Sequence, residues 1–215
     1  GLHSPTCRSK HPYCKPLGTK FHLLFLIFSS RIIQIKTVQH IFYLRDFVNL
    51  DDLNHCDIKQ AHIELLKCCG SSQWTEKMLA ARPYKSVSHL LELAGQIWSD
   101  LGEVDYLEAF AAHPKIGASK PPDNAKNTES WTSKEQAGMM SADEQTKLKL
   151  KTENQKYAEK FGYIFIVCAT GKSASEILEL LRIRLENSPE TELEIAAGEQ
   201  MKITNLRLNK MLRDA

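Results

Sequence analysis

Acidic residues are missing from the first 45 positions of this 215-residue chain, which carry seven lysines and arginines. The rest of the chain holds the other 21 of the 28 basic residues and all 26 acidic ones, so its formal charge is −5. A region with excess negative charge has no electrostatic reason to bind nucleic acid. We therefore predict a basic extension over residues 1–45 and one globular domain over residues 46–215.

Long hydrophobic runs are also missing. The most apolar stretch, Phe21–Phe28, is interrupted by Ser29, Ser30 and Arg31, whereas a membrane-spanning helix needs about 20 apolar residues. We expect no membrane anchor. A short apolar stretch among basic residues is typical of a targeting sequence, but no small-residue cleavage site follows it. A disordered or non-native extension is the preferred interpretation of residues 1–45, with a targeting segment or a folded element as alternatives.

Two common motifs for metals and nucleotides are absent. The six cysteines form no Cys-x-x-Cys pair and have no histidine at a spacing suited to zinc. We interpret them as free thiols and expect no metal site. Ala169–Ser173 resembles a phosphate-binding loop, but Ile166 occupies the position of its second glycine. A turn at Gly171 and a helix cap at Ser173 explain this segment without a nucleotide cofactor.

Helical periodicity extends through most of residues 46–215. It predicts helices from Ile58 to a stop at Gly70 and from Ser86 to near Gly102. It also predicts a third, short helix that carries Tyr106, Leu107 and Phe110 and stops at Pro114. Three later helices are predicted to begin with capping chemistry, at Ser141, Ser173 and Ser188.

The exception to this periodicity is Tyr163–Ala169, a run of β-branched and aromatic residues that is typical of a strand. A single strand has nothing in this sequence to pair with. We therefore expect a buried helix or an extended core segment here, and the predicted fold class is all-α.

Histidine is absent after residue 113. An imidazole is the side chain most readily tuned to move protons near neutral pH. His113 stands where an apolar helical run meets Pro114, a residue that normally ends a helix. It is either a helix-terminal imidazole bonded to a carbonyl group or the acid–base group of the carboxyl-terminal half of the chain.

Two charged residues accompany His113 as candidates. Glu135 is either functional or part of a capping box that begins at Thr132. Arg207 shares a helix face with Gln200 and Ile203, so it either extends outward to solvent or binds an anion in a pocket. A histidine, a glutamate and a fixed arginine together suit proton-coupled chemistry on a small anion, without a metal or a nucleophile.

Several motifs resemble the OHCU decarboxylase family. They are His113–Gly117, Glu135-Gln136, Tyr157–Phe165 and Lys202–Leu208, in that order, and the likeness runs from about residue 47 to 213. Enzymes of this family convert 2-oxo-4-hydroxy-4-carboxy-5-ureidoimidazoline (OHCU) to (S)-allantoin and CO2 in urate degradation. The motif at His113 is similar to that of plant members, in which this domain commonly precedes a transthyretin-like hydrolase domain.

The resemblance implies an all-helical bundle, often a homodimer, that works in the peroxisome or the cytoplasm on a small-molecule substrate and uses no cofactor. It also implies that His113 and Glu135 are catalytic and that Arg207 is the catalytic-site residue that binds the substrate. The implied pocket-lining residues are Pro114, Thr132 or Ser133, Gln136, Phe165, Ile166, Val167, Cys168 and Ala169.

Another class of function stays open from the residues alone. In a non-catalytic helical interaction module, His113 and Glu135 would serve as caps and Arg207 as a surface charge. A hydrolase that uses serine or cysteine is not supported, because no such residue lies in a nucleophile-elbow motif.

Overall fold

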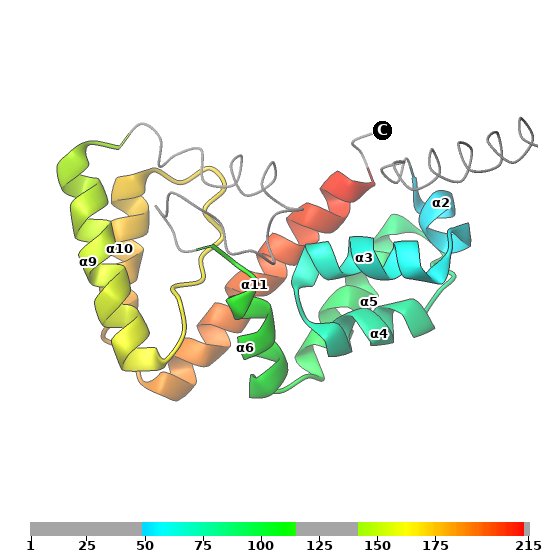
Figure 1. The fold of residues 1–215 in the computed structure, drawn as a ribbon, viewed down its shortest axis with the longest axis horizontal. Coiled ribbons are helices and arrows are strands. Elements are labelled where there is room, and N and C mark those ends of the chain that lie inside the picture. The colour runs from blue at the N-terminus through cyan, green and yellow to red at the C-terminus, as the bar shows by residue number, and fades with distance from the viewer. Residues whose placement is uncertain (1–48, 115–141, 213–215) are drawn as a thin grey trace, which may run out of the picture. The chain divides into compact units, whose positions relative to one another are not determined.

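A computed structural model describes residues 49–114 and 142–212, and these residues form eight α-helices and no β-strand (Figure 1). The all-α prediction is confirmed for this part of the chain. The helices are α2 (Leu50–His55), α3 (Ile58–Cys69), α4 (Ser72–Ala80), α5 (Val87–Ser99), α6 (Glu103–Ala111), α9 (Glu144–Phe161), α10 (Ala174–Arg184) and α11 (Pro189–Met211). Across the two described ranges, no helix is long and apolar enough to cross a membrane. The extension predicted over residues 1–45 lies outside the described residues.

Local capping chemistry sets most of the helix ends. The side chains of Ser86, Ser173 and Ser188 each accept the backbone N–H three residues later, and Pro189 occupies the first helical position of α11. Gly70 ends α3 in the left-handed conformation, at φ 86°. These starts and this stop agree with the sequence prediction.

The start of α9 corrects the prediction. The helix is capped by Asp143, not by Ser141, because Asp143 Oδ1 accepts the N–H of Thr146 at 2.8 Å. A serine followed by an aspartate two positions later offers two possible caps, and the aspartate is the one that is used. The third predicted helix is α6, which carries Tyr106, Leu107 and Phe110 as expected.

The first hydrophobic core joins helices α3, α4, α5 and α6 to the long helix α11. Helix α11 packs against α3, α5 and α6, as Figure 1 shows. Two buried tryptophans reinforce this packing by donating their indole N–H to backbone carbonyls, Trp74 to Ala94 and Trp98 to Ala197, both at 3.0 Å. The helix that carries Arg207 is therefore fixed against three others.

A second hydrophobic core joins α9 to α10, and the segment that precedes α10 contributes to both cores. Ile166 and Cys168 pack in the first core, whereas Phe165, Val167 and Ala169 pack in the second. Alternation with a period of two is the geometry of an extended chain. This run is thus an extended core segment, one of the two predicted outcomes, and no strand pairs with it among the described residues.

Candidate functional site at the junction of α3, α6 and α11

His113 lies immediately after the end of α6 and is half-buried. Its backbone N–H donates to the carbonyl of Phe110 at 3.1 Å, which closes the last turn. Its ring Nε2 lies 2.7 Å from Oε1 of Gln200. The imidazole is therefore held by a side-chain amide of α11, and the half-buried Pro114 follows it.

Gln200 is completely buried, and its amide makes contacts in two directions. Its Nε2 donates to the backbone carbonyl of Cys69 at 3.1 Å and to the hydroxyl of Thr204 at 3.2 Å. The Thr204 hydroxyl donates in turn to the backbone carbonyl of Gln200 at 3.0 Å. Because buried polar groups must be hydrogen-bonded to avoid a large desolvation cost, this network fixes the orientation of the amide.

Arg207 lies on the same face of α11 as Gln200. Seven residues separate them, which is nearly two turns and about 10 Å along the helix axis. Arg207 is only 6% exposed, and its Nη1 donates to the carbonyl of Lys67 at 3.3 Å. An outward, solvated arginine is therefore the wrong alternative. The guanidinium of Arg207 and the amide of Gln200 both bind carbonyls in the last turn of α3, where α-helices leave carbonyls without helical partners.

The ends of α3 and α6 meet at this junction. A Cβ placed on Gly70 would lie 2.7 Å from the Cβ of Ala112 and 3.4 Å from the carbonyl oxygen of Ala109. A glycine is thus required both by the left-handed conformation and by the close approach of the two helices. The residue after Ala112 is His113, so this contact helps to place the imidazole.

The two cysteines at the end of α3 are neutral thiols. Burial raises the pKa of Cys68 far above its ordinary value and raises that of Cys69 to about 12. The positive charge of Arg207 opposes this shift at both residues without reversing it. A protonated, fully buried thiol is not a nucleophile, so neither cysteine is a candidate for nucleophilic chemistry at this junction.

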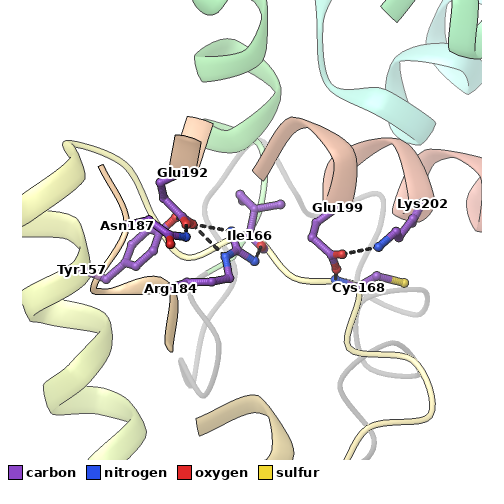
Figure 2. A network of polar contacts seen from close by, with 8 residues as sticks. All are labelled: Tyr157, Ile166, Cys168, Arg184, Asn187, Glu192, Glu199 and Lys202. Atoms are coloured by element: carbon purple, nitrogen blue, oxygen red, sulfur yellow. Dashed lines mark hydrogen bonds and ion pairs between the residues drawn. The ribbon is translucent and has the colours of Figure 1, made fainter. Parts of the chain in front are cut away.

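The extended segment Phe165–Ala169 is held by charged side chains that bind its backbone (Figure 2). Arg184 Nη1 donates to the carbonyl of Ile166 at 2.8 Å, and Glu199 Oε2 accepts the N–H of Cys168 at 2.7 Å. Lys172 Nζ donates to the carbonyl of Cys168 at 2.7 Å. Two of these groups belong to helices, Arg184 to α10 and Glu199 to α11, so the segment cannot shift without breaking buried or partly buried polar contacts.

Arg184 belongs to a buried ion pair that the sequence did not predict. Its Nε and Nη2 donate to Oε1 of Glu192 at 2.8 and 2.5 Å, and Asn187 donates to Oε2 at 2.7 Å (Figure 2). The hydroxyl of Tyr157 donates to the same carboxylate. Burial, together with this carboxylate, raises the pKa of Tyr157 well above its ordinary range. The carboxylate of Glu192 on α11 therefore links this helix to α9 and α10.

Of the three predicted catalytic residues, His113 contacts Gln200 of α11, and Arg207 lies seven positions after Gln200 on the same helix. Glu135 lies outside the described residues, as do the predicted pocket residues Thr132, Ser133 and Gln136. Gln200 was missed as a partner of His113. The sequence did contain a sign of it, since Gln200 lies seven positions before Arg207 and therefore falls on the same, mostly buried helix face.

Within the described residues, no group of three or more histidine, cysteine, aspartate or glutamate side chains could hold a metal ion.

The described residues form an all-α domain with two buried polar networks, one where α6 and the end of α3 meet α11 and one that links α9, α10 and α11. The chain belongs to the OHCU decarboxylase family, whose model matches residues 54–209. This agrees with the resemblance that the motifs indicated.

Relatives and a solved structure support the family assignment. The chain is 40% identical over 149 residues to the uric acid degradation bifunctional protein TTL of Arabidopsis thaliana, a match that covers 68% of this chain and 46% of that one. It is 34% identical over 100 residues to the mouse 2-oxo-4-hydroxy-4-carboxy-5-ureidoimidazoline decarboxylase, covering 46% of this chain and 56% of that one. The chain therefore spans only about half the length of these curated relatives.

Among solved structures, a crystal structure of OHCU decarboxylase in the presence of (S)-allantoin matches with a TM-score of 0.59 and 36% sequence identity. The match covers 69% of this chain and 96% of that one. The helical domain alone thus corresponds to nearly the whole of a decarboxylase chain.

Proposed function

We propose that residues 46–215 form a cofactor-independent decarboxylase that converts OHCU to (S)-allantoin and CO2. The observation that carries this proposal is that His113 contacts Gln200 of α11, while the buried Arg207 lies about two turns further along the same face of that helix. An imidazole can move a proton and a fixed guanidinium can bind a carboxylate or a polarised carbonyl. The relatives named for urate degradation and for this decarboxylation support the same reaction.

The chemistry requires no external electron sink. When the bond to the carboxylate breaks, CO2 leaves and its bonding electron pair stays with the imidazoline ring, where the conjugated carbonyl and ring nitrogens delocalise it. The ring then takes up one proton. Delivery of that proton to one face gives a single enantiomer of allantoin. A positioned acid–base group typically contributes roughly 10²–10⁴-fold to such a step.

Each candidate residue has a distinct role in this proposal. Arg207 binds the ring or ureido oxygens through its planar fork. Glu135 orients and polarises His113, which raises the proton affinity of the imidazole. His113 contacts the departing carboxylate or the adjacent hydroxyl and takes part in proton delivery.

The pocket proposed around these residues is lined by Pro114, Thr132 or Ser133, Gln136 and the segment Phe165–Ala169. The two helices that hold this segment in place, α10 and α11, support its inclusion, because a rigid wall keeps a small substrate oriented. We further propose a homodimer located in the peroxisome or the cytosol.

The reaction is tested by adding the purified 215-residue protein to freshly generated OHCU and following the circular dichroism of allantoin. The protein should produce the signal faster than the spontaneous reaction does. His113→Ala should lower the rate by about 100-fold or more, the scale of lost acid–base catalysis. The exposed His55 provides a matched control, and His55→Ala should leave the rate unchanged.

Equal rates with and without the wild-type protein would remove the decarboxylase proposal and favour the non-catalytic interaction module. Full activity in His113→Ala, with the control also active, would instead remove this imidazole from the mechanism. Glu135→Gln is expected to abolish CO2 release while leaving thermal unfolding nearly unchanged.

A further inference from the structure

The amide of Gln200 can be oriented in only one way. A backbone carbonyl accepts hydrogen bonds and never donates them, so the atom 3.1 Å from the Cys69 oxygen must be the NH2 group. The Thr204 hydroxyl supports the same assignment, because its own proton is directed to the Gln200 backbone carbonyl and its oxygen accepts from the amide. The amide oxygen is therefore the atom that faces His113.

This orientation determines where His113 carries a proton. An amide oxygen only accepts, so the ring nitrogen 2.7 Å from it must be a donor, Nε2–H. The neutral ring then has its lone pair on Nδ1, and the cationic ring adds its second proton there. The tautomer with a lone pair on Nε2 would set two acceptors against each other beside a fully buried amide.

We propose that Gln200 is a positioning residue that keeps the proton on Nε2 of His113, so that this histidine gains and loses its catalytic proton through Nδ1. The inference rests on the proposed function for its catalytic meaning, although the tautomer itself is a property of the free protein. The role is built into the fold, because the Cys69 carbonyl at the end of α3 fixes an amide on α11, and that amide fixes an imidazole at the end of α6.

The direct test is the tautomer of His113 in the substrate-free, 215-residue protein. Long-range ¹H–¹⁵N NMR spectra distinguish the protonated ring nitrogen from the unprotonated one, and the His113→Ala spectrum identifies the signals of this residue. We expect a ring that is protonated at Nε2 at all pH values at which the protein is folded. A neutral His113 protonated at Nδ1 would overturn the proposal without any variant at Gln200.

Two substitutions at Gln200 connect the tautomer to the reaction. Gln200→Met keeps the approximate shape and removes the acceptor, so His113 should lose its single tautomer. The kcat of Gln200→Met should fall roughly 10- to 100-fold, by analogy with the loss of a group that orients a metal-binding histidine. Its KM should stay within about threefold, because substrate binding is not the interaction removed. Gln200→Glu retains an oxygen opposite Nε2 but can no longer donate to the Cys69 carbonyl. It should lower stability, keep the Nε2–H signature and have a kcat above that of Gln200→Met.

A third substitution separates positioning from general stability. Thr204→Val disturbs the same buried network but leaves the Cys69 anchor and the contact to His113 in place. It should preserve the tautomer and most of kcat. A loss in Thr204→Val equal to that in Gln200→Met, or an unchanged tautomer in Gln200→Met, would overturn the proposal.

The NMR readout also distinguishes the failure of this inference from the failure of the proposed function. A protein that does not decarboxylate OHCU, but whose His113 tautomer depends on Gln200, would refute the enzyme assignment alone. An active protein in which substitutions at Gln200 change neither the His113 tautomer nor kcat would refute the positioning role alone.

Discussion

Ala112 approaches Gly70 so closely that a Cβ at the glycine would lie 2.7 Å from the Cβ of the alanine. The two residues on either side of this contact belong to the candidate site. Cys69 precedes Gly70 and supplies the carbonyl that anchors Gln200, and His113 follows Ala112 and binds the same amide. The contact between these two helix ends is therefore a structural requirement of the hydrogen-bond network.

Gly70→Ala should destabilise the protein for two reasons. The left-handed conformation costs an alanine about 1–2 kcal/mol, and overpacking against Ala112 adds roughly 1–3 kcal/mol. Gly162 provides a matched control, because it ends α9 at φ 81° and has nothing within 4 Å of an added Cβ. Gly162→Ala should show the conformational cost alone.

Both variants are compared by urea unfolding. Gly70→Ala should lose clearly more stability than Gly162→Ala, and the difference measures the steric cost of the α3–α6 contact. Equal losses would show that the ends of α3 and α6 separate easily, and would contradict a tight junction at His113.

Replacing Glu192 by glutamine should strongly destabilise the protein, because Glu192 forms a buried ion pair with Arg184. Glu192 is completely buried and accepts hydrogen bonds from Arg184, Asn187 and Tyr157. Glu192→Gln removes its charge and places an NH2 group among these donors, leaving the guanidinium buried without a counter-ion. Removing the charge of one partner of a buried ion pair typically lowers the free energy of unfolding by about 3–5 kcal/mol.

An exposed pair in the first turn of another helix provides the comparison. Glu144 contacts Lys147 at 2.9 Å on the surface of α9, where ion pairs contribute little because water screens them. In denaturant unfolding, Glu144→Gln should change stability far less than Glu192→Gln. Similar effects of the two substitutions would mean that the buried network relaxes or admits water.

Features encoded by a few neighbouring residues were predictable from the sequence. Gly70 stops α3, and Ser173 and Ser188 begin α10 and α11, because a cap depends on groups within three residues of it. The start of α9 was misplaced because Ser141 and Asp143 both satisfy that local rule. For Tyr163–Ala169 a paired strand was ruled out because a lone strand has no partner, but the sequence left both a buried helix and an extended segment open.

Features that depend on the meeting of distant segments were not predictable in the same way. Arg184 and Glu192 lie eight residues apart on two helices, and nothing in their spacing shows that the turn between α10 and α11 brings them together. Gln200 and Arg207 could be placed on one face from their spacing of seven. That Gln200 binds His113 follows only from the packing of α6 against α11.

Arg207→Lys tests whether the buried guanidinium binds the substrate. A planar guanidinium can hold the Lys67 carbonyl and a substrate oxygen in fixed directions, whereas an ammonium is a flexible point charge. We expect the KM for OHCU to rise by about tenfold or more, since a lost charged hydrogen bond is worth roughly 1.5–3 kcal/mol. Arg182→Lys on the exposed face of α10 is the control and should leave KM unchanged.

Arg207 could instead have only a structural role, because it also joins α11 to the end of α3. If its role were only to join these helices, Arg207→Lys would lower the free energy of unfolding and leave the KM of the folded fraction at its wild-type value. A raised KM in a protein that remains folded at the assay temperature is the outcome expected of a substrate-binding arginine. Measuring unfolding and KM on the same preparation separates the two.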